Sequence, residues 1–292
     1  MRNIAGLARG APRDETTMST ELTIKQVLCV KWGTLYGPEY VNRLYGMVSR
    51  HLSGPFRLVC LTDDPRGLRD EVEPAPLPEL GVPHPTKTMG KWRKVVLWGR
   101  ELAGLSGPVL FIDLDSVIVG DLDGYFTYGE PGDVIVARNW AKPMQRLGQT
   151  SVFRFPVGAN PHLLDDFRAD PQGVADRFQF EQHYVTSAVT GGVKFWPEPW
   201  TRHFRLHCMP PFPLNYVVPA RLPPDARIVT FPGGPNPDDV MVGRWNKRVP
   251  PHRGRLAHLL ATFSGDRVDD SRWRHLRRYV LPVPWIEQHW RE

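Results

Sequence analysis

The sequence of 292 residues contains few cysteines. Cys29, Cys60 and Cys208 are an odd number without metal-ligand spacing, and the first two lie inside the apolar runs LCV and LVCL. A disulfide framework and a zinc finger are therefore not indicated. We expect buried free thiols in a reducing compartment.

Long apolar runs are also lacking. No window approaches 18 consecutive apolar residues, and the opening MRNIAGLARGAPRDETTMST has no apolar core of the kind that a signal peptide needs. A membrane-spanning helix is thus not predicted, and we expect a cytoplasmic protein. Residues 1–20 are expected to form a disordered tail.

A compact block of Lys and Arg is missing too, although the formal net charge is +6. Positive charge favours anionic partners such as phosphate esters, nucleic acid or an anionic membrane surface. Because the chain lacks zinc-finger spacing and the aromatic signature of an RNA-binding domain, we expect small anionic ligands and no nucleic acid. A content of 41% hydrophobic and 23% charged residues is typical of a folded globular protein.

What is present begins with a strand, a helix and a second strand. IKQVLCV and FRLVCL are apolar strand candidates, and PEYVNRLYGMVSRHL between them carries apolar residues on one helical face, with Pro38 in the first turn. Such a βαβ unit implies a parallel sheet that binds ligands at the carboxyl ends of its strands. The residues expected at that rim are Lys31, Trp32, Gly33, Thr34, Asp63 and Asp64.

The rest of the chain alternates between strand, helix and proline-rich patterns without an internal repeat. We expect strands at residues 109–112, 133–138, 151–155 and 226–231, helices at 91–102, 160–167 and 178–189, and proline-rich irregular segments at 65–86 and 209–224. No boundary separates two domains. The pattern predicts one α/β domain over residues 21–265, followed by a basic, aromatic tail over residues 266–292.

Two copies of Asp-Leu-Asp follow the apolar segment VLFI. Asp113 and Asp115 come directly after it, at the position of a strand's carboxyl end. In an extended backbone their side chains point to the same side, and paired carboxylates suit a hard divalent cation that bridges to phosphate oxygens. Asp121 and Asp123 follow the short run VIVG and precede Gly-Tyr-Phe. We expect this second pair to bond to backbone amides in a turn.

The segment VLFIDLDSVIVGDLDGYF resembles the strand and D-x-D pattern of GT-A glycosyltransferases, especially glycosyltransferase family 8 and related bacterial enzymes. The order of elements is similar from VKWGTLYGPEYVNRLY to RIVTFPGGPNPDD, from about residue 23 to 240. The resemblance implies a Rossmann-like GT-A fold with a mixed, mainly parallel central sheet flanked by helices. It also implies transfer of a hexose, with retention of configuration, from a nucleoside diphosphate sugar, and we expect a UDP-sugar as this donor.

The resemblance also implies roles for particular positions. Asp113 and Asp115 would bind Mn²⁺ or Mg²⁺ and the diphosphate of the donor, and Lys94 would lie near the phosphates. FEQHYV resembles a helix start near the donor sugar, which places Glu181 and Gln182 beside the reacting centre, with Glu181 and His183 in place of the usual aspartates. Two rim segments, Lys31 to Thr34 and Thr62 to Asp64, would contact the base and ribose.

One segment departs from the family pattern. Where members commonly carry Phe-His-Gly, with the His as a third metal ligand, this chain has Phe231, Pro232 and Gly233. Proline offers no side-chain ligand. The cation is then held more weakly, or the reaction depends less on it, or another group replaces the histidine: Asp238, Asp239 or His252.

Two other functions fit part of the same pattern. IDLDSV matches the nucleophile motif of haloacid dehalogenase-type phosphatases, with Asp113 as nucleophile, although that motif usually opens its domain. A non-catalytic protein that binds nucleotide sugars is the third hypothesis, motivated by Pro232 and the altered Glu-Gln-His.

The final residues 271–292 alternate arginines with aromatic side chains. Trp273, Leu276 and Val280 share a helical face opposite Arg274 and Arg278, the pattern of a basic amphipathic helix at the anionic inner face of a membrane. A terminal helix that packs its tryptophans on the domain fits the pattern as well, and we favour it.

Overall fold

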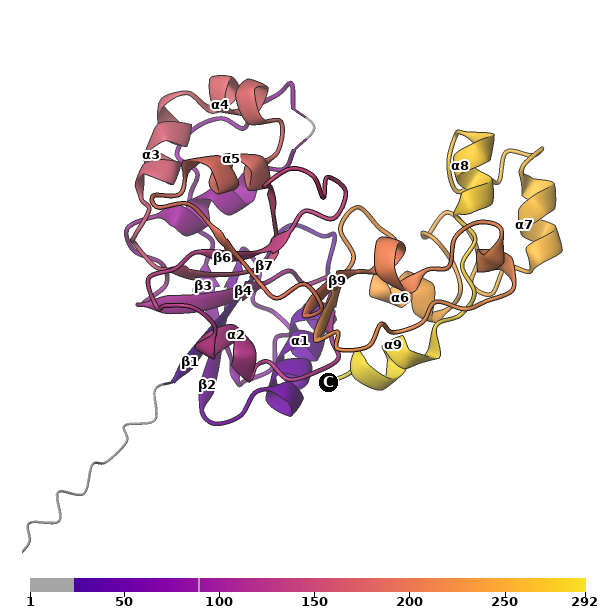
Figure 1. The fold of residues 1–292 in the computed structure, drawn as a ribbon, viewed down its shortest axis with the longest axis horizontal. Coiled ribbons are helices and arrows are strands. Elements are labelled where there is room, and N and C mark those ends of the chain that lie inside the picture. Colours follow the sequence, from indigo (N-terminus) through magenta and orange to yellow (C-terminus); the bar gives the residue numbers. More distant parts are fainter. Residues whose placement is uncertain (1–23, 89) are drawn as a thin grey trace, which may run out of the picture.

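The computed structural model describes residues 24–88 and 90–292 (Figure 1). The predicted tail of residues 1–20 lies outside this part. A large sheet with helices on both faces occupies one end of the molecule, and short helices from the last third of the chain reach the other end. None of the helices in the described ranges combines the length and apolar character that crossing a bilayer requires.

The large sheet is mixed and mainly parallel, as predicted. Its strands lie in the order β3-β2-β1-β4-β7-β6-β8. The first four run parallel to one another, β7 is antiparallel to β4 and β6, and β8 is parallel to β6. The bounds are β1 Lys25–Lys31, β2 Phe56–Thr62, β3 Val72–Pro76, β4 Pro108–Ile112, β6 Ile135–Arg138, β7 Gly148–Pro156 and β8 Lys194–Phe195.

A second sheet of three short strands continues from the turn after β4. Its order is β5-β10-β9, with β5 Ser116–Ile118, β9 Thr201–His203 and β10 Ile228–Thr230. Strand β10 pairs antiparallel with β5 and parallel with β9. This sheet connects the Asp-Leu-Asp segment to the last third of the chain.

The first helix, α1 Pro38–His51, forms where its sequence pattern predicts. Pro38 occupies the first turn, where its missing N–H costs nothing, and Val41, Leu44 and Val48 on the apolar face are fully buried. The other helices are α2 Asp123–Thr127, α3 His162–Ala169, α4 Pro171–Phe178, α5 Glu181–Ala188, α6 Pro237–Met241, α7 Arg255–Ala261, α8 Arg272–Arg277 and α9 Pro284–His289. Three short helices are not α-helices: η1 Arg93–Trp98 and η3 Leu214–Tyr216 are 3₁₀ helices, and η2 Phe204–Cys208 is a π-helix.

Both faces of the large sheet are covered, which explains why its central strands are apolar throughout. One face packs against α1, α9 and the small sheet through residues such as Val27, Leu44 and Ile286. The opposite face packs against η1, α3 and α5 through residues such as Trp98 and Phe167. All three cysteines are free and buried within this structure, as predicted.

Three local predictions were wrong. The proline-rich segment at residues 65–86 contains strand β3, which pairs with β2 at the sheet edge, where prolines are tolerated because no outer strand needs their N–H. The predicted helix at residues 91–102 is only the six-residue 3₁₀ turn η1. Helix α4 was missed, although Pro171 starts it and the Asp170 side chain accepts a hydrogen bond from the Gly173 N–H.

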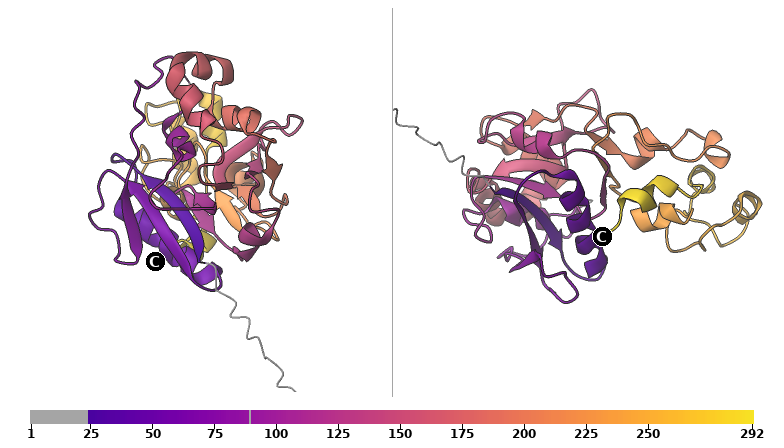
Figure 2. Two further views of the ribbon diagram at one scale, coloured as in Figure 1. Left: turned by 90° about the vertical axis from the view of Figure 1, so that its left-hand side faces the viewer. Right: turned by 90° about the horizontal axis from the view of Figure 1, so that it is seen from below.

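The C-terminal tail does not form the predicted amphipathic helix. Helix α8 ends at Arg277, so Val280 is not on its face, and Trp273 is 56% exposed. The chain then returns through α9 to α1, where Trp290 is buried with its ring centroid 5.0 Å from that of Tyr40. The favoured alternative, in which the tail packs on the domain, is therefore confirmed for its last turn (Figure 2).

Candidate functional site

The carboxyl ends of β1, β2 and β4 lie at one edge of the large sheet, as the βαβ pattern predicts. Lys31 is opposite Thr62 at the ends of β1 and β2, and Leu28 of β1 is opposite Phe111 of β4. Because these strands are parallel neighbours, the segments that follow them meet at the same edge. Asp113 and Asp115 follow β4 there.

A tight turn holds the two aspartates, so the backbone between them is not extended. The Asp113 N–H donates to the Ser151 carbonyl at 2.8 Å, and the Ser116 N–H donates to the Asp113 carbonyl at 3.1 Å. Leu114 between them is buried. Burial and repulsion by Asp113 raise the pKa of Asp115, as expected for two carboxylates that the turn brings close together.

Lys94 of η1 pairs with the first aspartate. Its Nζ lies 2.6 Å from Asp113 Oδ1 and also donates to the Thr150 carbonyl of β7 at 3.0 Å. Both charged side chains are about a quarter exposed, so the ion pair lies at the edge of the sheet, partly open to solvent, and not in the core. The 3₁₀ turn buries Val95 and Val96 on the sheet and thereby directs Lys94 toward the carboxylates.

The second aspartate has no basic partner within hydrogen-bonding distance in the described residues. Asp115 Oδ2 accepts a hydrogen bond of 3.3 Å from the Tyr36 hydroxyl, which also lies 3.4 Å from Asn236 Oδ1. Loss of hydration and repulsion by Asp113 raise the pKa of Asp115 to about 7. Negative charge is therefore crowded at this point, which favours a cation beside it.

Glu181 begins α5 near the same group but is buried. Its Oε2 accepts a hydrogen bond of 2.9 Å from Thr150 Oγ1, while Oε1 has no hydrogen-bond partner in the described structure. Burial raises the pKa of Glu181, and the charges of Lys94 and Asp113 also act on it. Gln182 is half-buried beside it. The predicted pair is thus next to the Lys94 and Asp113 ion pair.

The rim residues on β1 and β2 divide into anchors and exposed groups. Lys31 is buried, and its Nζ donates to the Asp64 carbonyl at 3.0 Å, which joins the ends of the two strands. Asp63 Oδ2 accepts a hydrogen bond of 2.9 Å from the Gly33 N–H. Trp32, which precedes Gly33, is 49% exposed. Two further rim residues differ in exposure: Thr34 is exposed, while Thr62 is buried with its hydroxyl bonded to Asp64.

The second aspartate pair accepts hydrogen bonds from backbone amides, as predicted, but only Asp121 does so within its own turn. Asp121 Oδ1 accepts from the Asp123 N–H at 3.0 Å, and its other oxygen pairs with Arg227 at 3.0 Å. Asp123 Oδ1 lies 2.5 Å from Lys25 Nζ and accepts from the Ser53 N–H. Asp121 therefore stabilises the start of α2, and Asp123 ties that helix to Lys25 and Ser53.

The segment around Pro232 approaches the site through its acidic residues. Asp239 is buried and paired with Arg244 at 2.6 Å, and His252 is exposed without a hydrogen bond or ion pair to Asp113 or Asp115 in the described structure. Asp238 has a buried Oδ1 without a partner, and its charge helps to raise the pKa of Tyr36.

Within residues 24–88 and 90–292, no three Asp, Glu, His or Cys side chains form a cluster suited to a metal ion. Asp113 and Asp115 offer two carboxylates with crowded negative charge. This donor set fits Mg²⁺ or Mn²⁺, which commonly use one or two protein carboxylates and complete their coordination with waters and substrate phosphates. Of the three predicted substitutes for the histidine, Asp238 is the one whose charge acts on Tyr36; its Oδ1 is buried without a partner in the described structure, and its Oδ2 lies 3.8 Å from Lys247 Nζ.

Tyr36, Thr150 and Asn236 belong to this site but were not predicted. Tyr36 lies in the quoted segment VKWGTLYGPEYV, just before α1, so its position after a rim loop was a usable signal. Asn236 is 200 residues further along the chain, and Thr150 lies inside a buried strand. Neither has a local pattern that points to Asp113 or Asp115.

The sequence matches no protein-family model, and no curated protein matches it either. Solved structures do match the fold. The galactosyltransferase LgtC in complex with donor and acceptor sugar analogues is 12% identical, with a TM-score of 0.53 over 73% of this chain and 88% of that one. The apo form of the glycosyltransferase GlyE from Streptococcus pneumoniae TIGR4 is 12% identical, with a TM-score of 0.50 over 87% of this chain and 62% of that one.

These similarities establish the architecture. The chain has the GT-A fold of glycosyltransferases, with a mostly parallel central sheet flanked by helices. The expectation of that fold is confirmed. At 12% identity the comparison concerns the path of the backbone, and function has to be argued from the side chains of the site.

Proposed function

We propose that the protein is a glycosyltransferase that moves a hexose from a nucleoside diphosphate sugar, specifically a UDP-sugar, to an acceptor. One observation carries the proposal: two crowded carboxylates, a lysine and a tyrosine meet at the carboxyl edge of a GT-A sheet. Open α/β sheets bind ligands at this edge. LgtC, which shares the fold, was solved with donor and acceptor sugar analogues, which supports the same class of ligands here.

Asp113 and Asp115 would hold Mn²⁺ or Mg²⁺. When bound, the cation would neutralise charge on the diphosphate as the sugar leaves. Asp115 is the more available ligand, because Asp113 is already paired with Lys94 at 2.6 Å. The hydrogen bond from Tyr36 holds the Asp115 side chain in place at the edge of the sheet.

Lys94 stabilises the departing diphosphate in this proposal. Its ammonium group is held by Asp113 and the Thr150 carbonyl, so it is in place before the donor binds. A fixed charge near the position where negative charge develops lowers the barrier without reorganisation. Buried Glu181 acts through Thr150, and Gln182 beside it would face the donor sugar.

The rim of β1 and β2 would bind the nucleoside. Exposed Trp32 offers an aromatic face for the base, and Thr34 and the Asp63–Asp64 turn offer polar groups for the ribose. Lys31 and Thr62 keep this rim in shape through their bonds to the Asp64 carbonyl.

Calorimetry against a panel of nucleotide sugars, with and without Mn²⁺, tests the proposal. We expect UDP-sugar binding that needs Mn²⁺ and that falls by at least about tenfold in Asp115→Asn, since the substitution removes one of two charged ligands. Asp121→Asn is the matched control, because Asp121 begins the second Asp-Leu-Asp and contacts Arg227 instead. Equal losses in both variants, or affinity that EDTA leaves unchanged, would contradict the metal-assisted site.

A non-catalytic nucleotide-sugar binding protein is the second candidate, motivated by Pro232 at the position of the expected histidine and by Glu181 and His183 in place of the usual aspartates. Metal-dependent binding without transfer to any acceptor and without slow hydrolysis of the donor would support this candidate. Hydrolysis of simple phosphomonoesters without affinity for nucleotide sugars would instead support the phosphatase hypothesis, in which Asp113 is the nucleophile.

A further inference from the structure

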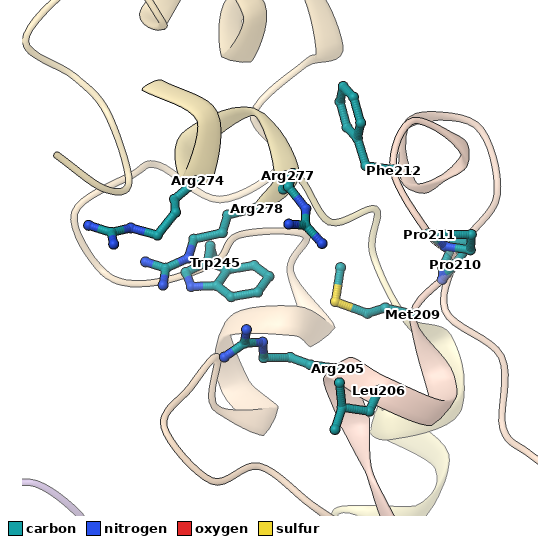
Figure 3. A pocket seen from close by; sticks show the side chains of 10 residues that line it. All are labelled: Arg205, Leu206, Met209, Pro210, Pro211, Phe212, Trp245, Arg274, Arg277 and Arg278. Carbon is teal, nitrogen blue, oxygen red and sulfur yellow. The ribbon is translucent and has the colours of Figure 1, made fainter. Parts of the chain in front are cut away.

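A pocket with a volume of about 440 Å³ lies in the last third of the chain, apart from the carboxylate site (Figure 3). This volume is within the range of small-molecule sites. Four arginines and a group of apolar side chains surround it. They are Arg205, Leu206, Met209, Pro210, Pro211, Phe212, Trp245, Arg274, Arg277 and Arg278.

The positive charge of this pocket is only partly compensated. Arg274 and Arg278 both pair with Asp269, the former at 2.7 Å. Arg205 and Arg277 make no side-chain hydrogen bond or ion pair within the described ranges. Only one carboxylate among the described residues, Asp269, is thus paired with any of the four guanidinium groups, and the pocket retains an excess of positive charge.

The arginines are close enough to repel one another. Burial lowers the pKa of Arg205, and the charges of Arg278 and Arg277 lower it further. Guanidinium groups of Arg205 and Arg278 lie 5.5 and 5.3 Å from the ring of Trp245, so one buried indole orients two of them. An anion between these groups would relieve the repulsion at little cost in side-chain entropy.

The charge and the planar donors indicate a phosphate more than a carboxylate. Guanidinium groups form paired hydrogen bonds with phosphate oxygens, and a phosphate monoester carries up to two negative charges. Trp245, Met209 and Phe212 provide apolar surface beside the arginines, as Figure 3 shows. The part of the ligand next to the phosphate is therefore apolar or aromatic.

The small sheet connects the segment that follows the carboxylates to the segment that leads into this pocket. Thr230 of β10 is opposite Ser116 of β5 on one side and His203 of β9 on the other. With a spacing of about 4.8 Å between strands, Ser116 and His203 are about 10 Å apart. Ser116 follows Asp115 directly, and Arg205 is two residues beyond His203. The small sheet therefore joins the backbone beside the carboxylates to the backbone beside the pocket.

We propose that this pocket binds the phosphate group of a ligand whose adjoining part is apolar or aromatic. That the ligand is the acceptor of glycosyl transfer rests on the proposed function, whereas the binding itself does not. The ligand is either a free phosphorylated molecule or a lipid with a phosphate in its headgroup, and the experiment separates these sources.

The test is calorimetric titration of the full chain with phenylphosphonate, which keeps the charge and the aromatic group but cannot be hydrolysed. We expect binding that weakens with added salt, with benzoate binding more weakly and benzyl alcohol not at all. Arg205→Gln and Arg277→Gln should each lower the affinity at least about tenfold. Arg177→Gln is the matched control, an exposed arginine on α4 in the other part of the molecule.

Sedimentation with phosphatidic acid vesicles, compared with phosphatidylcholine vesicles, identifies the source of the phosphate. Binding to either the soluble probe or the acidic vesicles, lost in Arg205→Gln and Arg277→Gln and kept in Arg177→Gln, supports the pocket. Binding to neither, or an equal loss in all three variants, overturns it.

Failure of this proposal and failure of the proposed function give different results. The two pocket variants should keep the UDP-sugar affinity of the wild type, and Asp115→Asn should keep its affinity for phenylphosphonate. Loss of the phosphonate binding in Asp115→Asn alone would assign it to the carboxylate site and would overturn the pocket.

Discussion

At the scale of single residues, Lys94 and Asp113 form the contact on which the candidate site depends. The Nζ of Lys94 makes two contacts, one with Asp113 and one with the Thr150 carbonyl, so a neutral side chain would leave Asp113 and Asp115 without a fixed positive charge. In the proposed mechanism the lysine acts on the developing charge of the leaving group.

We therefore expect Lys94→Met to lower the rate of UDP-sugar turnover by about 100-fold or more, with a smaller effect on donor affinity. The rate can be measured without a known acceptor, as the release of UDP when the enzyme hydrolyses the donor. Lys91→Met is the control, because Lys91 is an exposed lysine three residues earlier. Turnover at the wild-type rate in Lys94→Met would show that the lysine has only a local ionic role.

The residue scale also shows what sequence patterns can locate. Asp113 and Asp115 were predicted because an apolar strand ends directly before them, and the end of a buried strand marks the edge of the sheet. The reason given for their shared direction was wrong, since a turn and not an extended backbone brings them together. Tyr36 and Asn236 were not predicted, because the bond from Tyr36 to Asp115 and the bond from Tyr36 to Asn236 both join segments far apart in the chain.

At the scale of elements, α1 is held to the end of the chain by an unusual close contact. A side chain at Gly46 would meet the backbone of Glu292 at 2.5 Å, and Arg50 of the same helix donates to the carbonyls of His289, Arg291 and Glu292. Gly46 therefore permits the last turn to pack on α1. Helix propensity favours alanine at position 46, whereas packing against the last turn favours glycine.

Gly46→Ala distinguishes the two effects. Propensity alone would stabilise the helix by about 1 kcal/mol, whereas a clash with backbone in a packed contact costs about 1–3 kcal/mol. We expect packing to win, so that the free energy of unfolding in urea falls. Arg50→Ala, which removes three hydrogen bonds from the same contact, should act in the same direction. An increase in stability for Gly46→Ala would mean that the last turn does not dock on α1.

The elements also show where patterns fail. Strand β3 was missed and the helix predicted at residues 91–102 was too long. Proline content and periodicity report local preference, while sheet pairing and burial of Trp92 and Trp98 decided the outcome. Helix α1 was predicted well, because its apolar face and its terminal proline agree with its packing.

At the scale of the whole molecule, two buried histidines join α7 to α8. The rings of His258 and His275 stack at 4.0 Å, and each donates from Nε2 to the backbone carbonyl of the other. The Nδ1 of His275 accepts from the Val268 N–H, which requires an unprotonated Nδ1. Burial lowers the pKa of His258 to about 4 and also lowers that of His275, and Arg253 acts on both in the same direction.

This pair predicts a loss of stability in acid. Between pH 6.5 and about 4 the unfolded chain binds protons that the folded protein does not, so the free energy of unfolding falls as the pH falls through that window. The loss is on the order of 1–3 kcal/mol. Urea unfolding at pH 7.5 and pH 5 measures it. His258→Gln should reduce the difference between the two pH values, whereas His84→Gln, at an exposed position, should leave it unchanged.

The sequence by itself determined the α/β class, the burial of the cysteines and the position of Asp113 and Asp115. These features follow from the local pattern of apolar and polar residues, which can be read from each segment of the sequence alone. Only the tertiary structure decided which residues surround that carboxylate pair and that Arg205 and Arg277 share one pocket. Such contacts join residues far apart in sequence, and they depend on the path of the whole chain, which no local pattern encodes.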